Sequence, residues 1–122
     1  MFSIREISFS EASVFSQYCK KHKITLTPHF NYLGGYVGDE LVCISAYKFR
    51  GCVVLFSCSF TKESHRNNGY YNKMFDKRIE LSKGKYKVVA YCTKYSVKTF
   101  VRNGFSVVKS YKIGTHLMEK VL

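Results

Sequence analysis

The chain has 122 residues and carries 20 lysine and arginine side chains against eight aspartates and glutamates, a formal net charge of +12 at pH 7. This length predicts one domain over residues 1–122. Hydrophobic residues make up 46% of the sequence, which is enough for a core and argues against disorder. No apolar run approaches the roughly 20 residues of a membrane span, and the N-terminus does not resemble a signal peptide.

The positive charge is concentrated in the second half of the chain. Residues 1–61 hold six basic and four acidic side chains, whereas residues 62–122 hold fourteen basic and four acidic ones. A surface this basic favours polyanionic partners such as coenzyme A, nucleic acid or an acidic protein face. The alternative is that the lysines serve solubility alone.

Five cysteines give an odd number without a C-x-x-C pair, and four of them lie in apolar runs typical of strands. This usage predicts buried free thiols in the reducing cytoplasm. The four histidines show no spacing typical of metal ligands, so no metal is expected.

The first half of the chain predicts a strand, a helix and a hairpin. Residues Phe2–Phe9 alternate as in a strand, and Ser8 or Ser10 can cap an amphipathic helix over Ala12–His22. The inward side chains of that helix would be Val14, Phe15 and Tyr18. After a connection with the only proline come strands over 33–37, 41–49 and 52–60, the first two joined as a hairpin around Gly38-Asp39-Glu40. The aromatic residues of the connection, His29, Phe30 and Tyr32, would either line a substrate site or pack on the core.

The stretch Val53–Leu81 organises the chain. Val54, Phe56, Cys58 and Phe60 recur at the period of a strand, and a helix is expected over residues 68–82. The polar loop between them contains Arg66-Asn67-Asn68-Gly69. Backbone N–H groups at such a strand-to-helix loop attract anions, and Arg66 adds charge, so the stretch predicts a phosphate or diphosphate site.

The remaining residues predict a strand, a helix and a final hairpin. Residues 86–92 are continuously apolar, which predicts a strand buried on both faces and parallel to Val53–Phe60. A helix follows over residues 93–103 and stops at Gly104, and strands follow over 105–111 and 115–122. The order β-α-β-β-β-α-β-α-β-β gives an α+β fold with a mixed, mostly antiparallel sheet of about seven strands.

Two stretches resemble one family. Arg66–Tyr71 is similar to the R/Q-x-x-G-x-G/A loop of the GNAT superfamily of acyl-CoA-dependent N-acyltransferases, although Tyr71 replaces its second glycine. Ser96–Phe105 resembles the later family stretch A-x-x-x-Y-x-x-x-G-F. The two matches lie in the second half of the chain, and the first half fits the family only in its element order.

The resemblance implies a GNAT-like N-acetyltransferase that uses acetyl-CoA or another acyl-CoA as co-substrate and transfers the acyl group to an amine. The two strands would diverge at their ends and receive the pantetheine. The acceptor could be linked to nucleic acid or to an acidic protein, and the protein could be a monomer or a homodimer. The cofactor-binding residues would be Phe60, Thr61, Arg66, Asn67, Asn68, Gly69, Tyr70, Tyr71, Thr93 and Phe100.

The catalytic residues are less well matched to the family. Phe100 stands where the family often has a tyrosine that protonates the leaving thiolate, and no carboxylate lies on the strand before the loop. Ser59, Tyr95 and Ser96 are the remaining candidates. A base would be Glu63, His65, a water or none, if the amine arrives neutral.

Four other interpretations stay open. The chain could be a GNAT-like binding module without catalysis, or a basic nucleic-acid-binding domain whose loop grips phosphates. Cys58 and His65 could form a nucleophile–base pair, although Cys58 is better explained as a buried thiol. Lys94, Lys98 and Arg102 form a helix stripe that is either a polyanion site or a solvated face.

Overall fold

The computed structural model describes residues 1–21, 24–93 and 96–122. The strands are β1 (Phe2–Ile7), β2 (Asn31–Val37), β3 (Glu40–Arg50), β4 (Val53–Thr61), β5 (Lys87–Thr93), β6 (Ser106–Ser110) and β7 (Thr115–Val121). The helices are α1 (Phe9–Ala12), α2 (Ser16–Lys21), α3 (Tyr70–Leu81) and α4 (Val97–Arg102). None of the helices in these ranges has the length and hydrophobicity needed to cross a membrane.

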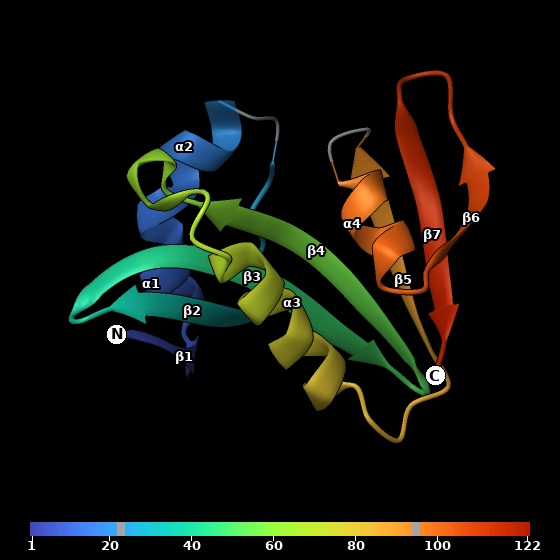
Figure 1. Cartoon of the computed structure of the whole chain (residues 1–122), viewed down its shortest axis with the longest axis horizontal. Coiled ribbons are helices and arrows are strands. Elements are labelled where there is room, and N and C mark those ends of the chain that lie inside the picture. The colour runs from blue at the N-terminus through green and yellow to red at the C-terminus, as the bar shows by residue number, and fades with distance from the viewer. Residues whose placement is uncertain (22–23, 94–95) are drawn as a thin grey trace. The chain divides into compact units, whose positions relative to one another are not determined.

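The strands form one seven-stranded sheet in the order β1-β2-β3-β4-β5-β7-β6 (Figure 1). The pairs β1–β2, β2–β3, β5–β7 and β6–β7 are antiparallel, and β4–β5 is parallel. The predicted α+β class and the mixed, mostly antiparallel sheet are therefore confirmed. The chain divides into two compact units, unit 1 (Met1–Lys48 with Cys58–Leu81) and unit 2 (Phe49–Ser57 with Ser82–Leu122).

The first helical region of unit 1 begins at a capping box. The Ser8 hydroxyl accepts from the Glu11 N–H at 3.0 Å, and the Glu11 carboxylate accepts from the Ser8 N–H at 3.1 Å. The prediction of one continuous helix over Ala12–His22 is wrong, because α1 and α2 are separated by a 3₁₀ turn. The Ser13 hydroxyl donates to the Ser10 carbonyl at 2.7 Å, a local bond that competes with regular helix.

This 3₁₀ turn also changes which side chains face inward. Phe15 is buried as predicted, but Val14 is 66% exposed and Tyr18 is 55% exposed, so those two predictions are wrong. Ala12 and Cys19 are the inward residues instead. A 3₁₀ turn has three residues per turn, so it shifts the face that a 3.6-residue period would bury.

Helix α3 covers one face of the unit 1 sheet. Met74 and Phe75 are buried. A methyl group added at Gly35 would come within 2.5 Å of the Phe2 ring and 3.2 Å of the Met74 sulfur. Glycine is therefore required on β2 for β1 and α3 to pack this closely.

The connection before β2 is packed on the core of unit 1. Tyr32 is 2% exposed, and its hydroxyl bonds to both the N–H and the carbonyl of Thr27 at 2.9 Å. Phe30 packs against the same core cluster, whereas His29 is exposed. For Tyr32 and Phe30, the interpretation as a loop packed on the core is confirmed.

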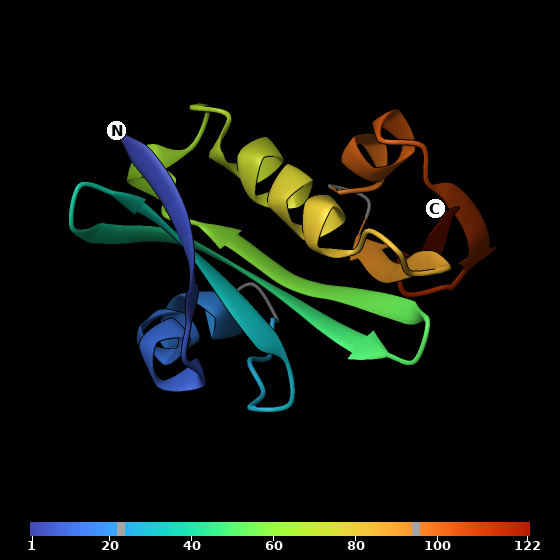
Figure 2. The ribbon, with the colours of Figure 1, turned by 90° about the horizontal axis from the view of Figure 1, so that it is seen from below.

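In unit 2, helix α4 covers one face of the strands. Phe100 of α4 meets Phe105 edge to face at 4.9 Å, and Phe105 in turn lies 6.4 Å from Phe56 of β4, measured between ring centroids. Figure 2 shows α4 on one side of β5 and β7, with no helix of this unit on the other side. The prediction that residues 86–92 are buried on both faces is therefore wrong, since Tyr91 is 65% exposed.

Candidate functional site

The parallel ladder between β4 and β5 ends before either strand does. It pairs Val53–Phe56 with Lys87–Ala90, whereas β4 runs on to Thr61 and β5 to Thr93. The predicted parallel orientation is confirmed. The end of β4 beyond this ladder leads directly into the loop that the sequence marks as an anion site.

A backbone kink lies just beyond the end of the ladder. Cys58 has a φ of 38°, in the left-handed region that side chains other than glycine rarely adopt. Its thiol donates to the Thr25 carbonyl at 3.1 Å, which holds the kink in place. Such kinks re-aim the side chains that follow in a strand. The alternating apolar pattern of Val54, Phe56, Cys58 and Phe60 does not predict this kink.

The loop after β4 is fixed to the sheet at its first residue. The Lys62 N–H donates to the Val42 carbonyl at 2.8 Å, and the Lys62 ammonium donates to the Glu40 carboxylate at 2.9 Å. The hydrogen bond and charge of Lys62 hold the pKa of Glu40 below its ordinary value. His65 N–H then closes a turn on the Lys62 carbonyl at 2.9 Å. The loop therefore starts from a defined position.

Side chains within the loop brace its second part. The Asn68 amide donates to the carbonyls of His65 at 3.1 Å and Arg66 at 3.3 Å. The Arg66 Nε donates to the Thr61 carbonyl at 3.1 Å and so ties the loop back to the end of β4. The bracing role of the Asn68 side chain was not predicted, although asparagine in loops often bonds to nearby backbone in this way.

The loop amides were predicted to face outward, and one of them does not. The Arg66 N–H donates to the Glu63 carbonyl at 3.3 Å, so the expectation that it holds phosphate is wrong. Within the ranges that the structure describes, the N–H groups of residues 67–70 donate to no protein acceptor.

The backbone of residues 67–70 is shaped to gather these N–H groups. Asn67 has a φ of 66° and Gly69 a φ of 76°, so two left-handed residues flank Asn68. Residues that alternate between left-handed and right-handed backbone conformations form a concave group of N–H donors. The start of α3 adds the positive end of its helix dipole. Nothing lies within 4 Å of a methyl group placed on Gly69, so the loop is open at that point.

The Arg66 guanidinium lies over the Phe60 ring, 5.7 Å from its centroid. The residue is exposed, and its terminal nitrogens have no hydrogen-bond partner among the residues described. The two terminal nitrogens can therefore still donate to an anion, as predicted from the sequence. The Nε cannot, because it already bonds to Thr61.

Four of the predicted residues lie at the end of β4 and the start of α3. The Tyr70 ring stacks on Phe2 at 4.1 Å between centroids, so it packs at the helix start. Phe60 is 6% exposed and packs on Phe15. Thr61 contributes its carbonyl to Arg66. Tyr71 is half-buried in the first turn of α3.

Three of the predicted site residues, Thr93, Ser96 and Phe100, belong to unit 2. The Thr93 hydroxyl lies 3.4 Å from the Ser96 hydroxyl, and the Ser96 N–H donates to the Thr93 carbonyl at 3.0 Å. Phe100 is 4% exposed, so its ring is a core group of unit 2 in this structure. Tyr95 lies outside the described residues, as does Lys94.

The candidate nucleophiles and bases are not brought together. Ser59 is half-buried on β4, and its hydroxyl forms no hydrogen bond with any described residue. The His65 ring pairs with Ser64 at 2.9 Å, and the Cys58 thiol pairs with Thr25, so the Cys58–His65 pair is not formed. Glu63 is exposed.

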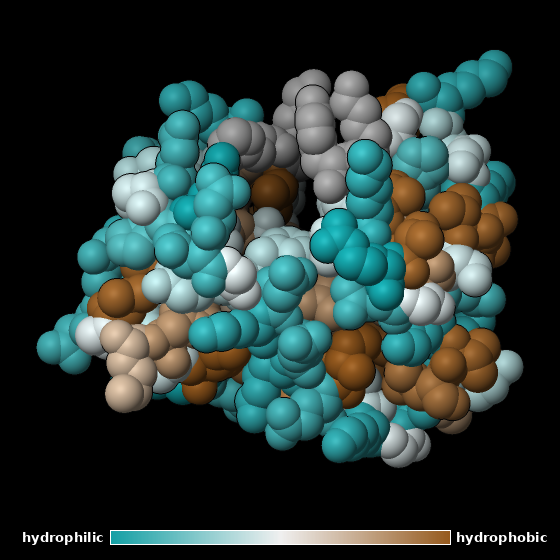
Figure 3. Space-filling view, viewed as in Figure 1, coloured by the Kyte–Doolittle hydropathy of each residue, from teal (hydrophilic) through white to brown (hydrophobic). Residues whose placement is uncertain are grey.

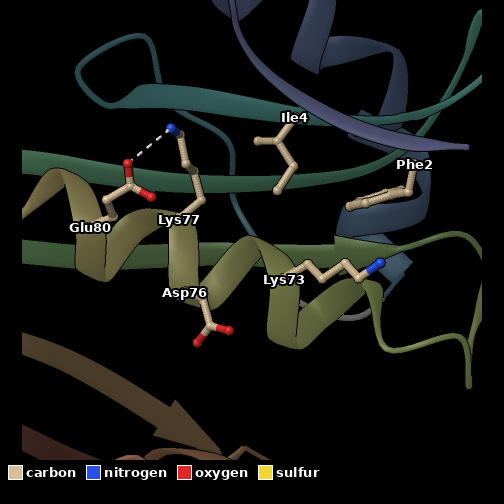
Figure 4. A pocket seen from close by; sticks show the side chains of 6 residues that line it. All are labelled: Phe2, Ile4, Lys73, Asp76, Lys77 and Glu80. Atoms are coloured by element: carbon tan, nitrogen blue, oxygen red, sulfur yellow. Dashed lines mark ion pairs between the residues drawn. The ribbon is translucent and has the colours of Figure 1, made fainter.

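Unit 1 also has an open groove of about 390 Å³ between β1 and α3 (Figure 4). Its walls carry two lysines and two acidic residues, and Lys77 pairs with Glu80 at 3.6 Å. Phe2 and Ile4 supply its apolar side. None of the predicted site residues lines this groove.

The sequence matches no family model and no curated protein. Solved structures do match. N-acetylglutamate synthase from Neisseria gonorrhoeae, complexed with coenzyme A and N-acetyl-glutamate, aligns with a TM-score of 0.80 at 14% identity over 100% of this chain and 35% of that chain. The chain thus spans about a third of the length of that protein.

Two shorter proteins align over their whole length. PaiA N-acetyltransferase from Thermoplasma acidophilum, in complex with coenzyme A, has a TM-score of 0.75 at 12% identity over 100% of this chain and 99% of that one. An acetyltransferase of the GNAT family from Streptococcus pneumoniae has a TM-score of 0.74 at 12% identity over 100% of both chains. The chain therefore has the fold of the GNAT acetyltransferases.

Proposed function

We propose that the chain is an acyl-CoA-dependent N-acyltransferase that uses acetyl-CoA or a related thioester. The observation that supports this most directly is the braced loop after β4, whose N–H groups at residues 67–70 have no acceptor in the described parts of the protein. The solved structures of the same fold include complexes with coenzyme A. A diphosphate is the anion of coenzyme A that suits a helix N-terminal loop.

The proposed binding mode uses the backbone of the loop and the charge of Arg66. Residues 67–70 would donate to the diphosphate, and the terminal nitrogens of Arg66 would add charge-assisted bonds. The pantetheine would run along the end of β4 beyond its ladder with β5, beside Ser59 to Thr61. Each charge-assisted bond contributes about 1.5–3 kcal/mol, so several suffice for micromolar affinity after ordering costs.

The proposed reaction needs little from side chains. The amine nitrogen attacks the thioester carbonyl carbon, a C–N bond forms, the C–S bond breaks, and the thiolate of CoA leaves while the amine loses a proton to water. Ser59 of unit 1, Ser96 of unit 2 and Tyr95 remain the candidate catalytic side chains from the sequence. Positioning of the two substrates supplies most of the rate in such a reaction.

The acceptor amine is proposed to belong to an acidic or nucleic-acid-linked molecule, because the chain has a net charge of +12. A cytoplasmic location is proposed on the five free thiols. The second candidate function is a binding module of the same fold without catalysis. It is favoured by the burial of Phe100 at the position of the family tyrosine and by the lack of a hydrogen-bond partner for the Ser59 hydroxyl among the described residues.

The test combines binding and turnover. Acetyl-CoA at about 100 times its Kd should stabilise the folded chain by about 2.7 kcal/mol, which is readily seen as a rise in Tm. Arg66→Ala should reduce the rise, whereas Lys20→Ala, a change at an exposed lysine of α2, should not. Release of free thiol with a panel of amines then separates an enzyme from a binding module. A Tm unmoved by acetyl-CoA and CoA at millimolar concentration would contradict both.

A further inference from the structure

Strands β5 and β7 of unit 2 present a face that no helix of the unit covers (Figure 2). Along β5 the side chains alternate, with Val88, Ala90 and Cys92 buried, Val89 half-buried and Tyr91 65% exposed. The half-buried and exposed side chains lie on the face opposite α4. A face left open on a sheet is available to a partner.

Aromatic and basic side chains gather on this face. Tyr91 of β5 and Lys109 of β6 are both paired with Leu117 of β7, so their side chains share one side of the sheet. The rings of Tyr91 and Tyr111 lie 6.4 Å apart at 44°, and the Lys109 ammonium lies 5.1 Å from the Tyr111 ring. The exposed ring of Tyr91, the half-buried ring of Tyr111 and the Lys109 cation therefore form one cluster.

The charge of the chain is concentrated in the same unit. Unit 2 holds ten lysines and arginines and one acidic residue, a net of +9, whereas unit 1 holds ten basic and seven acidic residues, a net of +3. The single acidic residue, Glu119, already pairs with Lys87 at 3.1 Å. Nothing else in unit 2 neutralises its cations, so the unit attracts polyanions and repels a second copy of itself.

The unit also exposes apolar side chains. Figure 3 shows hydrophobic surface over β6 and β7, where Val107 is 47% and Val108 52% exposed. β6 is the edge strand, but its register shifts between Val107 and Lys109, and it carries a lysine. Such irregular, charged edges resist pairing with another strand. The partner of this unit is therefore better sought on the open face than along the edge.

We propose that the open face of unit 2 binds single-stranded nucleic acid. Tyr91 and Tyr111 stack on successive bases, and Lys109 contacts a phosphate. An exposed ring, Tyr91, next to a half-buried ring, Tyr111, and a cation suit unpaired bases, whose faces are accessible, and do not suit a duplex, whose bases are already stacked. An acidic protein would match the charge, but its carboxylates would not stack on the Tyr91 and Tyr111 rings. The proposal does not depend on acyl transfer.

The test is fluorescence anisotropy with a labelled oligothymidylate of about 12 nucleotides, within the span of roughly 4–16 nucleotides that such surfaces cover. Tyr91→Ala and Tyr111→Ala should each weaken binding about tenfold or more. The matched control is Tyr18→Ala in unit 1, because Tyr18 is also exposed, at 55%, but lies outside this cluster. The conservative Tyr91→Phe and Tyr111→Phe variants keep a ring and should retain binding.

The role of the cations has its own readout. Lys109→Gln should weaken binding and reduce the slope of log K against log salt by about 1, since one phosphate contact is lost. Thermal unfolding of every variant establishes that it is folded before its affinity is interpreted. A duplex of the same length should bind more weakly than the single strand.

Several results would overturn the proposal. Equal affinity for polyglutamate and the oligonucleotide, with both tyrosine variants binding normally, would show a charged surface that suits an acidic protein. Dimers in sedimentation that dissociate in Tyr91→Ala would show that the face joins two copies of the chain. Binding that survives in both alanine variants but is lost in Arg66→Ala would move the nucleic acid to the loop in unit 1.

Discussion

Removing a single loop N–H tests how the loop binds. Tyr70 is the first residue of α3, where proline is well tolerated because the N–H of that position has no partner inside a helix. Tyr70→Pro therefore deletes one of the donors proposed for the diphosphate while leaving the helix intact. It also removes the ring that stacks on Phe2 at 4.1 Å. Tyr70→Ala removes the ring but keeps the N–H, so the difference between the two variants isolates the donor.

The expected size of this difference follows from the strength of one hydrogen bond to a charged group. Such a bond contributes about 1.5–3 kcal/mol, which is roughly a 10- to 150-fold change in Kd at 1.4 kcal/mol per tenfold. Isothermal titration with CoA should give a Kd for Tyr70→Pro that is weaker than that of Tyr70→Ala by this factor. Both variants should unfold cooperatively, with Tm values close to each other.

One result would show that the Tyr70 N–H does not bind the diphosphate. If the proline and alanine variants bind CoA equally well while both stay folded, the Tyr70 N–H does not face the ligand. The account of residues 67–70 as a group of outward donors would then be wrong. Free pantetheine, which carries no phosphate, should be insensitive to the proline and serves as the ligand control.

Three further outcomes follow from the packing and the titratable groups. Gly35→Ala should destabilise the fold by about 1–3 kcal/mol in urea unfolding, because its methyl group would lie 2.5 Å from the Phe2 ring; no loss would show that β1 moves freely. Burial, with a hydrogen bond to Glu6, raises the pKa of Tyr47 above its ordinary 10.0, so the folded state resists ionisation that the unfolded state undergoes. The contribution of Tyr47 to the free energy of unfolding is therefore fully present below pH 10 and is lost as the pH rises beyond it. The Tm should therefore fall less steeply with rising pH in Tyr47→Phe than in the unchanged protein. Equal slopes of Tm against pH in the two proteins would contradict this. Cys52 is the one exposed cysteine, so a thiol reagent should rapidly modify one cysteine per chain, as counted by mass spectrometry. In Cys52→Ser no cysteine should be modified rapidly.

The predicted element order was largely right because the periodicity of each segment agrees with its packing. In β4, Val54, Phe56 and Phe60 alternate and are buried, and Met74 and Arg78 mark the inner side of α3. These patterns depend on one residue and its near neighbours in sequence. These patterns can therefore be recognised in the sequence before the rest of the fold is known.

The features that were missed depend on contacts between distant residues or on local competition. The kink at Cys58 is held by Thr25, which lies 33 residues earlier, so no local pattern shows it. The exposure of Tyr91 follows from how much of unit 2 one helix covers, which composition does not reveal. The split of the first helix arises from a serine hydroxyl that bonds backward at Ser13, and this type of bond could have been expected from the run of serines.

The candidate site was predicted in its backbone more than in its side chains. The glycine of the loop does adopt a φ of 76°, and the loop does lie between β4 and α3. The direction of each side chain was not predictable, because Tyr70 is taken up by Phe2 and Arg66 is partly taken up by Thr61. Those partners come from β1 and β4, and only the folded chain brings them to the loop.

The most direct test of the proposed function is a titration of ¹⁵N-labelled protein with CoA, followed by the amide signals in NMR. The account predicts that the largest shifts fall on Asn67, Asn68, Gly69 and Tyr70, and that they saturate together at micromolar CoA. If CoA at saturating concentration leaves these four signals unmoved, or if they move only with inorganic phosphate at tens of millimolar, the loop does not hold the diphosphate of an acyl-CoA.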